Sequence, residues 1–170
     1  MSGGGMPTFA DVSQTKSPLV RSLHEWWVSN RGPAGLPDRA SFDPTEHTQL
    51  VAHMMICDLE PQPFRVRYRL VGTAVTGITG FDFTGRYLDE VLGPEATEPW
   101  LEYYSQVART RTPLLGTVKE ATKSGGTFEY EFGIFPVAQD GTDVKQFLAI
   151  EDYFGSTLLG AGLRPWPPRP

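Results

Sequence analysis

The segment from Arg67 to Leu92 constrains the fold more than any other part of the chain. It begins as a strand, continues through a run of glycines and threonines, and ends in an amphipathic helical turn. Its glycines are Gly72, Gly77, Gly80 and Gly85. Glycine adopts positive φ and permits close backbone contacts. We therefore expect the chain to leave a strand here and to cross a sheet through short helices.

The same glycines do not form a phosphate-binding loop. A Walker loop needs a lysine after its last glycine, and no lysine occurs between residues 17 and 118. A dinucleotide-binding fingerprint needs Gly-x-Gly at a strand-to-helix turn, and this segment contains no Gly-x-Gly. The segment is therefore predicted to turn corners and to line a pocket.

Hydrophobic periodicity predicts the order of the remaining elements. Helices are expected over 18–31, 43–54 and 94–112, and strands over 54–60, 63–72, 113–121, 127–138 and 143–154. Two strands, a helical crossing and three further strands are typical of an α+β domain. We expect a five-stranded antiparallel sheet with helices on one face, preceded by the N-terminal amphipathic helix.

The helix predicted at 18–31 carries two adjacent tryptophans. Ser17 is suited to cap this helix and Pro18 to begin it. The tryptophans must be buried against a large surface, either the back of the sheet or a second copy of the chain. In the second case the protein is a homodimer, and its interface comprises Leu19, Leu23, Trp26 and Trp27.

The two ends of the chain are expected to lie outside one folded domain over 18–157. Residues 1–17 contain few apolar side chains and are predicted to be a flexible lead-in, of which residues 1–5 need not be native. Residues 158–170 are a proline-rich tail, which cannot form a helix or a central strand. That tail is either a docking peptide or a frayed end.

Composition narrows the classes of function. The chain has 15 Lys and Arg against 20 Asp and Glu, a balance that is not typical of nucleic-acid-binding proteins. No apolar run reaches the roughly 20 residues that a membrane span needs, and the N-terminus lacks a secretory signal. We therefore expect a cytoplasmic protein without nucleic-acid or membrane partners. Its one cysteine, Cys57, is expected to be a small buried side chain.

The turn Gly80-Phe81-Asp82-Phe83-Thr84-Gly85-Arg86 and residues 87–91 resemble the segment in which PAS domains leave their second strand. Upstream, a set of residues is similar to the opening of short, stand-alone bacterial PAS-like proteins. They are Trp26, Arg31, Gly32, Pro37, Arg39, Asp43 and Pro44. The resemblance covers about residues 18–155. It implies a non-catalytic sensory or interaction domain that often pairs through N-terminal helices. Because no effector module follows, it also implies an unidentified signalling partner protein.

The resemblance implies a ligand or cofactor between the sheet and the crossing helices, or none. A flavin photoadduct needs a cysteine in the helical region, and a haem site needs a histidine there, whereas His24, His47 and His53 all precede the second strand. We therefore expect no haem, covalent flavin or metal, but a small apolar or aromatic ligand. The residues expected to bind it are Tyr68, Leu70, Ile78, Phe81, Phe83, Trp100, Tyr104, Tyr130 and Phe132.

Two other functions stay open at this point. The same aromatic residues would form an ordinary core in a ligand-free dimeric adaptor. A small enzyme of the ketosteroid-isomerase-like cone fold would need a base inside an apolar pocket. The candidates for that base are His53, Asp58 and Asp82. The identity of the ligand and of the partner does not follow from the residues.

Overall fold

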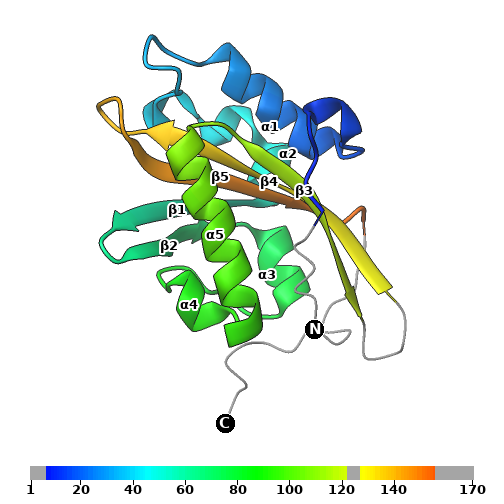
Figure 1. Ribbon diagram of the computed structural model, residues 1–170. Helices are drawn as coiled ribbons and strands as arrows, with labels where there is room; N and C mark the ends of the chain where they lie inside the picture. Colours follow the sequence, from blue (N-terminus) through cyan, green and yellow to red (C-terminus); the bar gives the residue numbers. More distant parts are fainter. Residues whose placement is uncertain (1–6, 122–126, 156–170) are drawn as a thin grey trace.

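A five-stranded antiparallel sheet forms the centre of the computed structural model, which describes residues 7–121 and 127–155. Its strands are β1 (Met54–Pro61), β2 (Phe64–Val71), β3 (Leu114–Ala121), β4 (Thr127–Ala138) and β5 (Val144–Asp152). They lie in the order β2-β1-β5-β4-β3 (Figure 1). This sheet, with its helices, confirms the predicted α+β fold.

The helices lie on both sides of this sheet. They are α1 (Pro18–Ser29), α2 (Thr48–Val51), α3 (Thr73–Thr79), α4 (Leu88–Val91) and α5 (Pro94–Thr110). The crossing helices α3, α4 and α5 cover one face, and α1 lies on the other side (Figure 1). The helix predicted at 43–54 is split into a short 3-10 turn, Pro44–Glu46, and α2, because His47 between them has a non-helical φ of −128°.

The register between β4 and β5 assigns their side chains to the two faces. Phe132 lies opposite Glu151, and Glu131 lies opposite Asp152. Successive side chains of a strand point to opposite faces, so the two pairs face in opposite directions. The ring of Phe132 packs edge to face against Trp100 of α5, with 4.9 Å between centroids. The pair Phe132 and Glu151 therefore faces α5, and the pair Glu131 and Asp152 faces α1.

Helix α1 buries its tryptophans against the back of the sheet in the same chain. The indole Nε1 of Trp27 donates to the backbone carbonyl of Pro136 in β4 over 2.7 Å. Trp26 packs edge to face on Phe42, with 5.0 Å between centroids, and Leu23 is fully buried. Leu23, Trp26 and Trp27 are therefore buried within their own chain, Trp27 against the sheet and Trp26 against Phe42. These side chains are not available to a second copy.

Residues 7–17 are attached to the domain, which corrects the prediction of a flexible lead-in. Thr8 forms a bridge with Gly116 at the edge of β3, and the amide of Phe9 donates to the carbonyl of Leu115 over 2.8 Å. The segment is thus held largely by hydrogen bonds of its backbone. Such bonds cannot be predicted from the pattern of hydrophobic residues. Residues 1–6 and the predicted proline-rich tail at 158–170 lie outside the described residues.

Two buried carboxylates fix the start of α1. Glu131 accepts hydrogen bonds from the amides of Lys16 and Ser17, each at 2.9 Å, and from the hydroxyl of Thr15. Asp152 accepts from the hydroxyl of Ser17 over 2.6 Å. Both carboxylates satisfy donors next to a helix N-terminus, where negative charge is favoured. We call Glu131, Asp152 and residues 15–17 the N-terminal clasp.

Gly72 marks the point where β2 ends and the chain turns into α3. A Cβ on Gly72 would lie 2.3 Å from the carbonyl oxygen of Ala52 and 2.4 Å from that of Val51. No side chain fits in this gap. Gly80 and Gly85 are needed for a different reason, because their φ values of 83° and 87° lie in the left-handed region. These glycines of the crossing segment therefore permit a close backbone approach and positive φ, as the sequence predicted.

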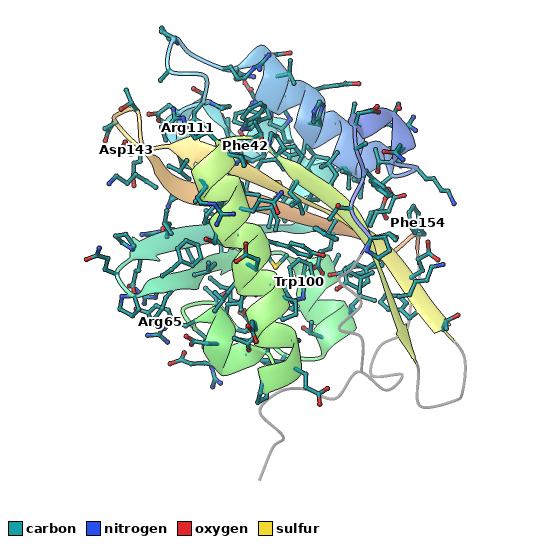
Figure 2. All side chains as sticks on the ribbon, viewed as in Figure 1. Phe42, Arg65, Trp100, Arg111, Asp143 and Phe154 are labelled. Carbon is teal, nitrogen blue, oxygen red and sulfur yellow. The ribbon has the colours of Figure 1, made fainter. Side chains whose placement is uncertain are left out.

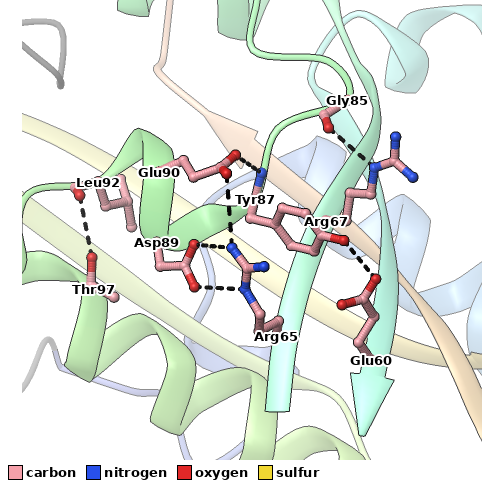
Figure 3. Close-up of polar contacts among 9 residues, drawn as sticks. All are labelled: Glu60, Arg65, Arg67, Gly85, Tyr87, Asp89, Glu90, Leu92 and Thr97. Carbon is pink, nitrogen blue, oxygen red and sulfur yellow. Dashed lines mark hydrogen bonds and ion pairs between the residues drawn. The ribbon is translucent and has the colours of Figure 1, made fainter. Parts of the chain in front are cut away.

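A polar cluster on the surface ties α4 to β2 (Figure 3). The Arg65 guanidinium donates two hydrogen bonds, of 2.9 and 2.7 Å, to the carboxylate of Asp89 and lies 3.5 Å over the ring of Tyr87. The hydroxyl of Tyr87 donates to Glu60 over 2.7 Å. Arg67, two residues along the strand, donates to a backbone carbonyl of the crossing segment over 3.1 Å. These arginines therefore hold the crossing segment against β2.

We expect Gly72→Ala to lower the free energy of unfolding by about 3 kcal/mol, because the added methyl group meets backbone carbonyls that cannot rotate away. Denaturant titration followed by circular dichroism measures this loss. Gly141→Ala is the matched control, since a Cβ there meets nothing closer than 3.9 Å. Equal stability of the two variants would contradict the close approach at Gly72.

We expect Glu131→Ala to lower the free energy of unfolding by about 3 kcal/mol, because it leaves three donors of the N-terminal clasp without their acceptor. Hydrogen exchange at the amides of Lys16 and Ser17 should accelerate in the same variant. Glu129→Ala removes an exposed carboxylate from the same strand and should change little. A Glu131 variant that matches the Glu129 variant in both measurements would show that the clasp does not stabilise α1.

Candidate functional site

A cavity of about 260 Å³ lies between the sheet and the crossing helices. The sheet contributes one wall through β1, β2, β4 and β5, and the other wall comes from α3, residues 81–83 and α5. Trp100 extends from α5 toward the sheet (Figure 2). Ligand pockets commonly measure about 300–1,000 Å³. The cavity lies just below this range and suits an organic molecule of small size.

Most of the residues predicted to bind a ligand line this cavity. They are Tyr68, Ile78, Phe81, Phe83, Trp100, Tyr104 and Tyr130. They come from β2, the crossing segment, α5 and β4, which are far apart in the sequence. The fold thus brings together residues that the sequence could connect only through the family resemblance.

Leu70 and Phe132 do not line the cavity. Leu70 is 38% exposed, because the pairing of β2 with β1 shifts by one residue between Tyr68 and Leu70. Beyond such a bulge, side chains point to the opposite face from the one that strict alternation predicts. The sequence analysis assumed strict alternation along β2 and therefore placed Leu70 on the wrong face. Phe132 is 1% exposed and packs against Trp100 and Tyr103 of α5. It therefore belongs to the packed core and not to the cavity wall.

The wall residues outside the predicted set include a partly buried carboxyl–hydroxyl pair at the end of β5. Glu151 and Tyr153 line the cavity at the end of β5. A signal for both was present, because Phe147, Ala149, Glu151 and Tyr153 alternate along the strand, and Phe147 packs on Tyr104 of α5. A carboxylate on an otherwise apolar strand face is uncommon without a partner or a function.

Aromatic rings contact one another around the cavity. The Tyr68 ring meets Phe83 edge to face, with 4.6 Å between centroids. On the side of β4, Tyr153 contacts Tyr130 at 5.4 Å and Phe128 at 5.9 Å. Edge-to-face and offset contacts of this kind stabilise aromatic clusters. The rings therefore support one another and present a mostly apolar surface.

The polar groups of this surface are hydroxyls and one carboxylate. The hydroxyl of Tyr153 donates to the carboxylate of Glu151. Burial raises the pKa of Tyr68, Tyr104 and Tyr153 well above the usual value, and the negative charge of Glu151 raises it further. These tyrosines are therefore neutral at physiological pH. Among the described residues, the hydroxyl of Tyr68 has no hydrogen-bond partner.

The residues around the cavity do not fit covalent flavin or haem. Neither Cys57 nor any of the three histidines is among the described residues that line it. The thiol of Cys57 lies 3.8 Å from the hydroxyl of Tyr104, and burial raises its pKa from 9.0 to about 12. His53 contacts the ring of Tyr153, but its Nδ1 donates to the backbone carbonyl of Glu151 over 2.9 Å.

The three candidate bases of a cone-fold enzyme lie outside the described cavity wall. His53 is hydrogen-bonded to the backbone carbonyl of Glu151. Asp58 accepts a hydrogen bond from Arg69 over 3.0 Å. Asp82 accepts one from the amide of Thr84 over 2.9 Å and so shapes the turn. The described residues contain no cluster with metal-site geometry. They also include no helix with the length and apolar character needed to cross a bilayer.

We expect iodoacetamide to modify Cys57 about a thousandfold more slowly in the folded protein at pH 8 than in guanidinium chloride, because burial and the raised pKa suppress the thiolate. Mass spectrometry of timed samples measures the two rates. Comparable rates in the two conditions would show that the thiol is exposed in the folded protein.

Comparison with known proteins finds one family. A family model described as the PAS domain matches residues 15–150, which is most of the chain. The search of curated proteins found no match to this chain.

Similar solved structures include photoreceptor and PAS domains. A light-oxygen-voltage domain studied with a flavin analogue has a TM-score of 0.49 and 16% identity, over 73% of this chain and 91% of that one. A PAS domain from Colwellia psychrerythraea has a TM-score of 0.45 and 12% identity, over 65% and 94%. The light-state dimer of the fungal blue-light photoreceptor Vivid has a TM-score of 0.44 and 15% identity, over 59% of this chain and 76% of that one. These similarities are distant.

Proposed function

The chain belongs to the PAS domain family, and from this premise we propose that it is a cytoplasmic sensory or protein-interaction module that binds a small apolar or aromatic ligand. Its output passes through a partner protein, and it has no catalysis of its own. The observation that carries this proposal is the cavity of about 260 Å³ between the sheet and the crossing helices, with its aromatic wall.

The cavity wall suits a flat or compact apolar ligand with a few polar atoms. The rings of Tyr68, Phe83, Trp100 and Tyr130 offer apolar faces. Binding sites for small molecules typically combine such faces with a small number of polar groups that orient the ligand. The hydroxyl of Tyr68 and the carboxylate of Glu151 supply these groups.

The signal is carried by the crossing segment over residues 73–94. Its helices α3 and α4 are short, and the segment is tied to the sheet beside Gly72 and through the pair Arg65 and Asp89. Between these attachments, Ile78 and Phe81 face the cavity. A ligand that contacts both walls stabilises one arrangement of the segment over others and thereby shifts its population.

Dimerisation is part of the proposal, through the outward face of α1. Val28 is 40% exposed on this face, whereas Leu19 is partly buried against the core. Trp26 and Trp27 do not contribute, because both are already buried within the same chain.

Native mass spectrometry of the freshly purified protein tests the ligand, with a denatured sample to fix the covalent mass. We expect a non-covalent mass increment on the folded protein. Ala96→Phe places a ring into the cavity from α5 and should abolish the increment. Gln106→Phe adds the same ring at an exposed position of α5 and should retain it.

A wild-type protein without an increment, and with the same affinity for added aromatic compounds as Ala96→Phe, would contradict the ligand proposal. The module would then act as a ligand-free adaptor. A retained increment in Ala96→Phe would place the ligand elsewhere on the protein.

A further inference from the structure

The charge of the cavity wall has one sign. Among the described residues that line the cavity, Glu151 is the sole charged side chain, and lysine, arginine and histidine are absent. Eight aromatic residues of the described chain share the wall with it: Tyr68, Phe81, Phe83, Trp100, Tyr104, Phe128, Tyr130 and Tyr153. The faces of aromatic rings carry partial negative charge. The wall is therefore electronegative as well as apolar.

The sheet and one hydrogen bond determine where Glu151 points. Its register opposite Phe132 places it on the face toward α5. The hydroxyl of Tyr153 donates to its carboxylate, which holds the side chain beside the aromatic rings. Its negative charge contributes to the raised pKa of Tyr68 and Tyr104 after burial and the neighbouring Cys57. The effect of the carboxylate therefore extends across the cavity.

The three charge classes of ligand differ in how they meet this wall. An anion would be repelled by Glu151 and by the ring faces. A neutral apolar ligand gains no electrostatic attraction from the carboxylate. A cation gains from the carboxylate and from the faces of tyrosine and tryptophan. Electrostatics thus favours a positive ligand.

We propose that the cavity binds a small organic cation, a protonated arylalkylamine or a quaternary ammonium compound, with its nitrogen beside Glu151. This inference rests on the proposed ligand-binding function and adds the charge of the ligand to it. Where the ligand is a protonated amine, the hydroxyl of Tyr68 provides an acceptor for its N–H at the same wall. The apolar part of the ligand lies against residues of α3 and α5, such as Ile78 and Trp100.

Three probes of similar size test the charge preference by isothermal titration calorimetry. Benzyltrimethylammonium is the cation, neopentylbenzene is its neutral isostere, and phenylacetate is an anion. We expect the cation to bind the wild-type protein at least about tenfold more tightly than the neutral isostere. The anion should bind more weakly than both.

Glu151→Gln keeps the shape of the side chain and removes its charge. It should weaken binding of the cation about tenfold and leave the affinity of the neutral probe unchanged. Glu129→Gln makes the same change in net charge at an exposed position of β4 and should leave both affinities unchanged. If Glu151→Gln does not fold, the order of the three affinities on the wild-type protein still tests the charge preference.

Tighter binding of the neutral or anionic probe would overturn the cation proposal and leave the ligand-binding function in place. A cation preference that Glu151→Gln does not reduce would also overturn it, since the carboxylate would not be its origin. Binding of none of the probes would overturn the cation proposal, and the mass increment would then decide the proposed function independently.

Discussion

The antiparallel pairing of β4 with β5 determines what each face of the sheet can do. Glu131 and Asp152 lie opposite each other on one face, where they bind the N-terminal clasp of α1. Phe132 and Glu151 lie opposite each other on the other face, toward the cavity. Since a shift by one residue would exchange the faces, one register fixes both the attachment of α1 and the charge of the cavity wall.

Hydrogen bonds attach the crossing segment to its surroundings near Gly72 and again over residues 85–89. Gly72 brings the chain against residues 51–52 at the start of α3, and Arg65 holds α4 through Asp89. Between these points the wall of α3 and residues 81–83 rests on aromatic contacts such as Phe83 on Tyr68. Such contacts have no fixed hydrogen-bond geometry, so this wall can adjust to a ligand. The opposite wall belongs to the rigid sheet.

Much of this arrangement could be predicted from the sequence. The strands, the tryptophan helix and most of the aromatic wall follow from periodicity, capping residues and the family resemblance. Leu70 could not be placed correctly, because a bulge leaves no signature in an alternating pattern. Residues 7–17 were misjudged because their attachment uses largely backbone groups and the carboxylate of Glu131. Glu151 was overlooked although its strand face could be read, because a single acidic residue at a strand end usually indicates exposure to solvent.

A crystal structure of the wild-type protein with benzyltrimethylammonium tests the central claim most directly, which is that the cavity is an electronegative ligand site. The account predicts electron density for the probe inside the cavity, with the ammonium group beside the carboxylate of Glu151 and its methyl groups against the rings of Tyr130 and Tyr153. Probe density confined to the outer surface, or inside the cavity with its ammonium group directed away from Glu151, would contradict it.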